Sequence, residues 1–361
     1  MDLSGRKHSL SGGTLSVPAD HASVERTRRR RQMTPRVAII GGGVSGLTCA
    51  VSFAERGFRT AIFAKQIGQQ TTSGAAAALW FPYDAEPIEK VIPWALATYK
   101  MLVDLVKDPR SGVSMIELRQ YCRIGGIQIP DWAGPFVIST DLPVMSSEVE
   151  TSLIISESAF SSGFAINVPL MDTTIYLDYL ANRFQKAGGA INANVRFDKL
   201  EDVDPKFDLI INCVGIGARE LLHDVDLEPH RGQVAIVPKI DKVKCAIVCD
   251  DAPLMYAIPR TNDCVFGGTN EISDKLMVDP TSTTRIVAEC SRVLKIDNPR
   301  SLEERVGLRP FRKSGVRLEK EKLRDGRLVI HNYGHGGSGF TLSWGCGENV
   351  LQIATGPSGK S

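Results

Sequence analysis

Three glycines spaced as G-x-G-x-x-G could bring backbone N–H groups against a phosphate. The apolar, β-branched run Val37 to Ile40 precedes them and predicts a strand buried on both faces of a parallel sheet. A helical apolar face and a second apolar strand follow, and the whole segment has the length of a βαβ dinucleotide-binding unit. The glycines permit a tight turn, close approach of a pyrophosphate and close packing of helix on strand. The predicted cofactor-binding residues here are Gly41, Gly43, Val44, Ser45 and Gly46.

The second strand of this unit ends in Ala64 and Lys65, where a dinucleotide site commonly has an acid that binds a ribose hydroxyl. Lys65 is either a solvated surface lysine or a partner for a phosphate, and the sequence does not choose between them. Because the acid is missing, this motif alone does not indicate NAD. A nicotinamide-dependent dehydrogenase therefore stays only an alternative.

The chain has 361 residues, of which 43% are hydrophobic and 23% are charged, as in an ordinary globular protein. Its formal net charge is +2, but the first 32 residues hold seven basic and three acidic side chains, so the remainder carries about −2. Residues 1–34 are expected to form a disordered basic tail. The rest is not expected to bind nucleic acid. Export through the arginine run is disfavoured, because the apolar residues that follow it belong to the nucleotide fold.

Eight cysteines show no C-x-x-C pair and no zinc-ligand spacing, so no metal site is expected. Several lie in apolar runs, where buried reduced thiols are usual, and a reducing cytoplasm is the expected location. No apolar run reaches the length of a membrane span, and no membrane partner is expected. A homodimer is one assembly compatible with the sequence, which does not fix the oligomeric state.

Strand-like and helical stretches alternate in a way that predicts an α/β protein, with a Rossmann-like domain interleaved with an antiparallel-sheet domain. Helices are predicted at 172–186 and 283–294, and hairpin strands at 231–237 and 255–268. Ala75 to Ala78 permit either a tight contact between elements or passage past a bulky cofactor. The predicted nucleotide domain is discontinuous and comprises 35–80, 165–229 and 307–361. The predicted substrate domain comprises 81–164 and 230–306.

Several stretches between Arg36 and Gly347 resemble the D-amino-acid oxidase family of flavoproteins, which includes D-aspartate oxidases. Six glycines between Val329 and Gly347 are the most specific part, since glycine destabilises regular elements and so is hard to explain as core packing. The resemblance implies FAD as the cofactor. The stretches that carry it are RVAIIGGGVSGL, the segment Ala77 to Tyr83, INCVGIGAREL, RGQV, YAIPR, FGGT, VGLRP and HNYGHGGSGFTLSWG.

The resemblance also implies roles for single residues. Arg309 corresponds to the arginine that clamps the substrate carboxylate, for which a planar guanidinium is suited. Tyr256 corresponds to a tyrosine that reaches the same carboxylate, and Gly337 to a glycine whose carbonyl accepts from the amine. The alternatives are a structural ion pair for Arg309 and a core position for Tyr256. Tyr83 and Phe81 complete the predicted substrate pocket. The other flavin contacts implied are Lys65, Thr71, Thr72, Ala78, Leu79, Val195, Gly215, His335, Gly336, Gly337, Ser338, Gly339, Phe340 and Thr341, with His335 acting through its backbone and His331 merely packed.

The implied reaction is oxidation of a neutral or apolar D-α-amino acid to a 2-oxo acid, ammonia and hydrogen peroxide. Hydride passes from Cα to flavin N5, and O2 is the final acceptor. The chain departs from the family at Ala252, where many members have a lid tyrosine, and at Phe81, where a glutamine is common. Asn270 offers no second cation for an acidic substrate, and Arg260 is expected to be a solvated turn arginine. The alternatives are D-aspartate oxidase, then glycine or sarcosine oxidase, then a flavin-binding protein without turnover. The terminal Gly-Lys-Ser does not indicate a peroxisomal address.

Overall fold

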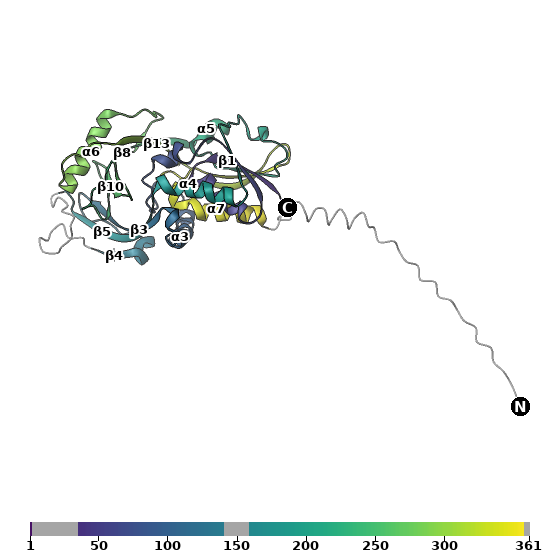
Figure 1. Ribbon diagram of the computed structural model, residues 1–361, viewed down its shortest axis with the longest axis horizontal. Coiled ribbons are helices and arrows are strands. Elements are labelled where there is room, and N and C mark those ends of the chain that lie inside the picture. Colours follow the sequence, from purple (N-terminus) through teal and green to yellow (C-terminus); the bar gives the residue numbers. More distant parts are fainter. Residues whose placement is uncertain (2–34, 141–158, 357–361) are drawn as a thin grey trace. The chain divides into compact units, whose positions relative to one another are not determined.

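The computed structural model describes Met1 and residues 35–140 and 159–356. Pro35–Ser361 forms one compact unit separate from Met1–Thr34, and the predicted basic tail lies outside the described residues. Figure 1 shows two sheets in this unit, one around β1 and one around β8 and β10, with α3, α4 and α7 between them. Among the described residues, no helix combines the length and apolarity that crossing a membrane requires.

The first sheet has six strands and contains the predicted βαβ unit. β1 is buried from Val37 to Ile40 and lies between two parallel neighbours, β2 and β7, as its apolar composition predicts. The last strand, β14, is antiparallel to β15. In spatial order the strands are β14 (Arg317–Lys322), β15 (Leu328–Tyr333), β7 (Leu209–Asn212), β1 (Arg36–Gly42), β2 (Arg59–Ile67) and β6 (Ala190–Ala193).

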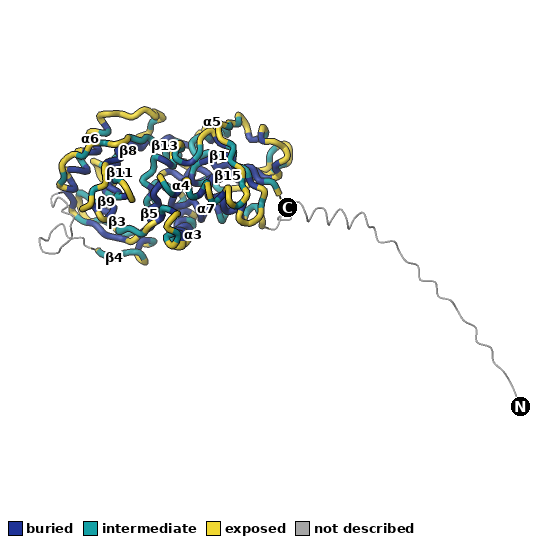
Figure 2. Tube along the Cα trace, viewed as in Figure 1, coloured by how far each residue is buried: buried dark blue, intermediate teal, exposed yellow. Residues whose placement is uncertain are grey.

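Four helices, α2 (Val44–Ala54), α3 (Ile88–Leu105), α4 (Thr173–Lys186) and α7 (Gly339–Thr355), pack in a contiguous group. α2 packs against α4 and α7, and α7 also packs against α3. Asp172 caps α4 by accepting a hydrogen bond from the Thr174 N–H, so the helix starts where the sequence predicts. One apolar cluster joins these helices to strands of both sheets, and Figure 2 shows buried segments in this region.

The second sheet has nine strands and is largely antiparallel, as predicted. The predicted hairpin is present as β10 and β11, while β3 and β9 form a parallel pair. β13 (Glu303–Arg312) pairs with β8 along its whole length, and α6 (Pro280–Leu294) packs on β8, β10 and β11. α5 (Ala218–Leu221) follows β7. The remaining strands in spatial order are β12 (Glu271–Ile272), β8 (Leu227–Pro238), β11 (Asp263–Gly267), β10 (Met255–Pro259), β9 (Ala246–Cys249), β3 (Val113–Cys122), β5 (Ser162–Met171) and β4 (Val137–Ser139).

These two sheets confirm the predicted fold class, and the chain passes between them several times. The boundaries predicted at 165, 230 and 307 fall inside β5, β8 and β13, all strands of the second sheet. Strands of this length run through the predicted boundaries because their pairing continues on both sides of those positions. The division into two domains therefore stays a prediction, with the strands themselves as the observed units.

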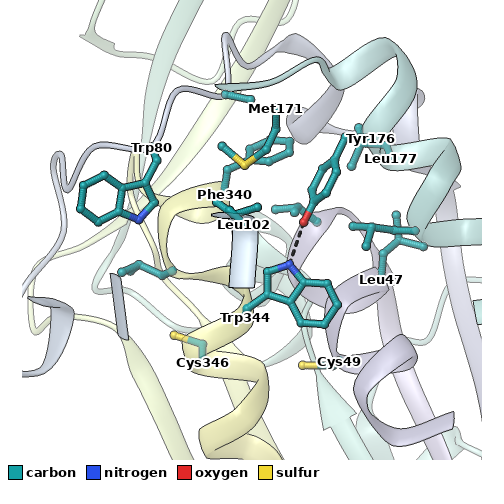
Figure 3. Packing of buried hydrophobic residues seen from close by; sticks show 14 of the residues in the cluster. Leu47, Cys49, Trp80, Leu102, Met171, Tyr176, Leu177, Phe340, Trp344 and Cys346 are labelled. Atoms are coloured by element: carbon teal, nitrogen blue, oxygen red, sulfur yellow. Dashed lines mark hydrogen bonds between the residues drawn. The ribbon is translucent and has the colours of Figure 1, made fainter. Parts of the chain in front are cut away.

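A buried hydrogen bond between α4 and α7 generates a test of this packing. The Trp344 indole N–H donates to the Tyr176 hydroxyl at 2.8 Å in the core (Figure 3). Tyr176→Phe retains the ring but leaves the buried indole N–H without its acceptor, and we expect a loss of about 1–3 kcal/mol in the free energy of unfolding. Urea unfolding of the FAD-bound protein measures it.

Tyr99→Phe is the matched control. The Tyr99 hydroxyl makes only a 3.5 Å contact with the Asn167 carbonyl in an exposed position, so its removal should cost below about 0.5 kcal/mol. Equal losses in the two variants would contradict a specific role for the buried pair.

Candidate functional site

A single cavity of about 730 Å³ runs from the β1–α2 turn to the second sheet. Its size is in the range of cavities that hold a large ligand. Its wall includes the glycine turn at one end and residues of β9, β10 and β13 at the other. The residues predicted to contact cofactor or substrate that line it are Gly41, Gly43, Val44, Ser45, Lys65, Thr71, Thr72, Ala78, Leu79, Phe81, Tyr83, Val195, Gly215, Tyr256, Arg309, His335, Gly336, Gly337, Gly339 and Phe340.

The glycine turn has the geometry of a phosphate cradle. Gly41 has φ +115°, and a Cβ here would stand 2.3 Å from the Cys213 carbonyl oxygen of the adjacent strand end. α2 begins after Gly43, which provides no side-chain cap, so the amides of its first turn need partners from outside the helix. The Val44 N–H donates to Ser73 Oγ at 3.0 Å, and a Cβ on Gly43 would crowd that same hydroxyl. A negatively charged pyrophosphate fits this end of the cavity.

Small side chains line the middle of the cavity and leave room for a flat, extended group. Ala75, Ala76, Ala77 and Ala78 all line it, which favours passage past a bulky cofactor over a mere contact between elements. On the opposite side the 335–340 loop leads into α7, whose N-cap Ser338 makes no side-chain cap. The first-turn amides of α7 can therefore stabilise negative charge on a bound group. These observations fit FAD.

Three of the predicted flavin contacts lie outside the cavity wall. Gly46 packs against the Gly41 backbone, where a Cβ would stand 2.0 Å from the carbonyl oxygen. Ser338 Oγ accepts from the Tyr83 N–H at 2.7 Å and donates to the Tyr83 carbonyl at 2.6 Å. Thr341 Oγ1 exchanges the same pair of hydrogen bonds with the backbone of Phe81 at 3.1 and 3.0 Å. The two hydroxyls thus position the segment that carries Phe81 and Tyr83.

Arg309 and Tyr256 meet at the second-sheet end of the cavity, on β13 and β10. Each occupies space left by a cross-strand glycine. A Cβ on Gly232 would stand 2.5 Å from the guanidinium, and one on Gly267 would stand 1.9 Å from the Tyr256 ring. Among the described residues, no carboxylate forms an ion pair with Arg309, so its charge is available to an anionic ligand.

Asn270 connects Arg309 to Tyr83. Arg309 Nη1 donates to the Thr269 carbonyl at 3.2 Å and to Asn270 Oδ1 at 3.3 Å, and Asn270 Nδ2 donates to the Tyr83 hydroxyl at 3.1 Å. Burial, with nearby carboxylates, raises the pKa of Tyr83 to about 12, so its hydroxyl stays protonated at neutral pH. Burial also raises the pKa of Tyr256. Both hydroxyls can therefore donate hydrogen bonds to an anion.

The two histidines of the 329–340 segment are not placed as acid or base groups. His335 is buried, its Nε2 lies 3.0 Å from Asn332 Oδ1, and burial lowers its pKa to about 4. Its ring is therefore neutral at pH 7, and its role through the backbone stays a prediction. His331 is fully buried between Asn212 and Glu321, which agrees with the prediction of a packed histidine.

The expectation of a solvated Arg260 is wrong. Its side chain is about 1% exposed, forms two hydrogen bonds to Asp263 and donates to Thr173 Oγ1 at 3.0 Å. The β10–β11 turn brings Asp263 beside Arg260, and Thr173 at the start of α4 accepts from the guanidinium, so its partners include one brought in by tertiary packing. This guanidinium does not line the cavity wall and offers no second cation to a substrate.

Sequence reasoning missed Gly232, Gly267, Gln120 and Asp250 as parts of the site. The two glycines matter because strand pairing places Gly267 opposite Tyr256 and Gly232 diagonal to Arg309, which only the register reveals. Gln120 and Asp250 line the cavity from β3 and from the end of β9. The alternation of polar and apolar residues in 113–122 could have indicated an inward-facing Gln120, but not what it faces.

Comparisons with known proteins identify the family of this chain. The family model described as "FAD dependent oxidoreductase" (DAO) matches residues 36–353. The chain is 36% identical to a D-amino-acid oxidase of Rubrobacter xylanophilus, covering 90% of this chain and 97% of the relative, and 34% identical to one of Streptomyces coelicolor, covering 88% and 96%. A glycine oxidase structure from Geobacillus kaustophilus shares the fold with a TM-score of 0.73 at 17% identity, covering 89% of this chain and 95% of that one. The chain therefore belongs to the D-amino-acid oxidase family of FAD-dependent oxidoreductases.

Proposed function

We propose that this protein oxidises neutral D-α-amino acids in preference to D-aspartate. The products are the 2-oxo acid, ammonia and hydrogen peroxide, the reaction of its family. The observation that carries the substrate preference is the distribution of charge in the cavity. Near Tyr256 the wall has one cation, Arg309, while Lys65 lies in β2 and Arg196 follows β6, both strands of the other sheet.

A second carboxylate on the substrate would therefore lack a partner. It would also meet Asp250, which shares the wall with Tyr83 and Tyr256 and lies near enough to contribute to the raised pKa of Tyr83. The second carboxylate and Asp250 would repel each other in this partly desolvated cavity. Arg309 is the single cation at this end, so it suits a substrate with one carboxylate.

The chain's own residues hold the substrate for reaction. Arg309 binds the α-carboxylate through two parallel N–H donors, and the Tyr256 hydroxyl donates to the same group. The Gly337 carbonyl accepts a hydrogen bond from the α-amine. Phe81, at the cavity wall, and the aliphatic side chains near it exclude water from Cα. Bound FAD supplies the acceptor for the hydride that leaves Cα, and O2 is reduced afterwards. No protein base is assigned, because the tyrosine hydroxyls stay protonated and the substrate amine is neutral when it reacts.

A substrate panel tests this proposal. Purified FAD-bound protein is mixed with D-alanine, D-phenylalanine, D-aspartate, glycine and L-alanine, with flavin bleaching followed without oxygen and peroxide measured with oxygen. We expect kcat/KM for the neutral D-isomers to exceed that for D-aspartate by at least about tenfold, the ratio that about 1.4 kcal/mol of unfavourable interaction gives. Preference for D-aspartate, or for glycine, would support the corresponding other oxidase, and absence of bleaching by all five would support a flavin-binding protein.

Gly232, on the strand paired with that of Arg309, provides a test of the clamp. In Gly232→Ala the new methyl group would lie within 2.6 Å of the guanidinium carbon and must displace it. We expect KM for D-alanine to rise about fivefold, since a forced rotamer costs about 1 kcal/mol, with the flavin content unchanged.

Gly126→Ala is the matched control, because nothing lies within 4 Å of a Cβ at that exposed position. Its KM should equal that of the unmodified protein. An unaltered KM in Gly232→Ala would show that Arg309 does not hold the substrate in this orientation.

We further propose a homodimer in a reducing cytoplasm. All eight cysteines are free, and Cys49 and Cys213 stay thiols although their sulfurs lie 4.0 Å apart, which supports the reducing compartment.

The dimer is supported by an exposed apolar loop. Ile272 and Met277 in this loop are 70% and 84% exposed, and a second copy could cover them. Light scattering on the purified FAD-bound protein should give twice the mass of one chain, and the mass of a single chain would refute the dimer.

A further inference from the structure

His230 and Asp84 form a pair beside the carboxylate clamp that the proposed reaction does not use. His230 Nδ1 lies 3.0 Å from Asp84 Oδ2, and the two side chains are 14% and 18% exposed. A carboxylate only accepts hydrogen bonds, so Nδ1 carries the proton that points to Asp84. Among the described residues, this N–H is the one donor that binds the Asp84 side chain. His230 therefore fixes where that carboxylate points.

Strand pairing places His230 next to Arg309. The two residues lie directly opposite each other on β8 and β13, so their side chains leave the sheet on the same face. The Arg309 guanidinium lies over Gly232, where a Cβ would stand 2.5 Å from Nη2. The His230 ring instead stacks on Phe311, with ring centroids 4.6 Å apart and ring planes at 16°. The two neighbours thus extend in opposite directions along the sheet.

Asp84 is also connected to the clamp through its neighbour in the chain, Tyr83. Asn270 donates to the Tyr83 hydroxyl at 3.1 Å and accepts from Arg309 at 3.3 Å. Burial is the main cause of the raised pKa of Tyr83, and the Asp84 charge adds to this rise while the Arg309 charge opposes it. The carboxylate and the guanidinium therefore both lie near the same hydroxyl.

The backbone of Asp84 is fixed in an uncommon conformation. Its φ is +53°, in the left-handed region that few residues with a Cβ adopt. Its carbonyl oxygen lies against Gly336, where a Cβ would stand 1.7 Å from that oxygen. Such outliers persist only where the surrounding structure holds them. With the backbone fixed, rotation of the side chain alone decides which cation the carboxylate meets.

We propose that His230 is a positioning residue that keeps the Asp84 carboxylate from pairing with Arg309, so that the guanidinium stays free for the substrate carboxylate. This inference rests on the proposed role of Arg309 as the clamp. A carboxylate of the chain would compete with the substrate, because the guanidinium offers the same planar pair of donors to both. The imidazole binds Asp84 outside the cavity wall and leaves the wall to the substrate.

Substitutions of His230 and Asp84 test this role with D-alanine as the substrate. His230→Phe keeps a ring to stack on Phe311 but removes the donor, and we expect KM to rise at least about fivefold with kcat unchanged within about twofold. His230→Asn keeps an N–H near the position of Nδ1–H and should retain the original KM. Asp84→Asn is the matched control, since asparagine tolerates the left-handed φ and has no charge to restrain, and its KM should be unaltered.

The double variant separates positioning from packing. If the pair only stabilises the fold, it is lost in His230→Phe and stays lost when Asp84→Asn is added, so KM would be high in both proteins. We expect the double variant to have the original KM, because the freed carboxylate is what occupies the clamp. A KM that His230→Phe does not raise, or that Asp84→Asn does not restore, would overturn the proposal.

Binding without turnover gives a second readout. Benzoate has a carboxylate for Arg309 but no α-amine to oxidise, and benzamide is its uncharged counterpart. Both are titrated into the oxidised FAD-bound protein while the flavin spectrum is followed. We expect His230→Phe to raise the Kd of benzoate at least about fivefold and to leave that of benzamide unaltered, with Asp84→Asn again restoring the original value. Equal changes for the two ligands would refute a competition for the cation.

Arg309→Met distinguishes failure of this role from failure of the clamp. If Arg309→Met leaves the Kd of benzoate unaltered, the clamp itself fails and the role of His230 fails with it. If Arg309→Met weakens benzoate binding but His230→Phe does not, the clamp stands and only the role of His230 fails. Should His230→Phe not fold with flavin, His230→Leu carries the same comparison, because leucine also lacks a donor.

Discussion

The guanidinium of Arg309 is the charge on which the arrangement of the second sheet depends. Within the described residues it has no carboxylate partner, and its Nη1 donates only to the Thr269 carbonyl and the Asn270 amide oxygen. A half-buried cation in this state costs free energy unless an anion arrives, so the cavity is built for an anionic ligand. Gly232 leaves the space for the guanidinium.

The same constraint explains why the clamp depends on residues that do not touch a substrate. Asn270 holds Arg309 and Tyr83 together, while Ser338 and Thr341 fix the backbone of the segment that carries Tyr83 and Phe81. Neutral hydrogen bonds of this kind orient a charged group without cancelling its charge. A carboxylate in place of the Asn270 amide would pair with Arg309 and compete with the substrate.

The cavity is polarised along its length. Arg309 provides the positive charge near Tyr256, and Asp250 provides the negative charge beyond Val248. This distribution of charge disfavours a second carboxylate on a ligand whose first carboxylate binds Arg309. The backbone amides at the starts of α2 and α7 line the remaining length, where FAD carries its negative charge.

The sequence by itself determined the βαβ unit, the FAD-dependent family and the residues Arg309, Tyr256 and Gly337 as candidates. These features are local, because a glycine turn between a buried strand and a helix needs only its neighbours to be recognised. Tertiary structure alone decided which side chains complete the cavity. Gln120, Val248 and Tyr256 share a face only through the register of β3, β9 and β10, and Arg260 is buried against Thr173 of α4, which lies 87 positions away in the chain. Strand pairing joins residues more than a hundred positions apart, and no local pattern encodes that register.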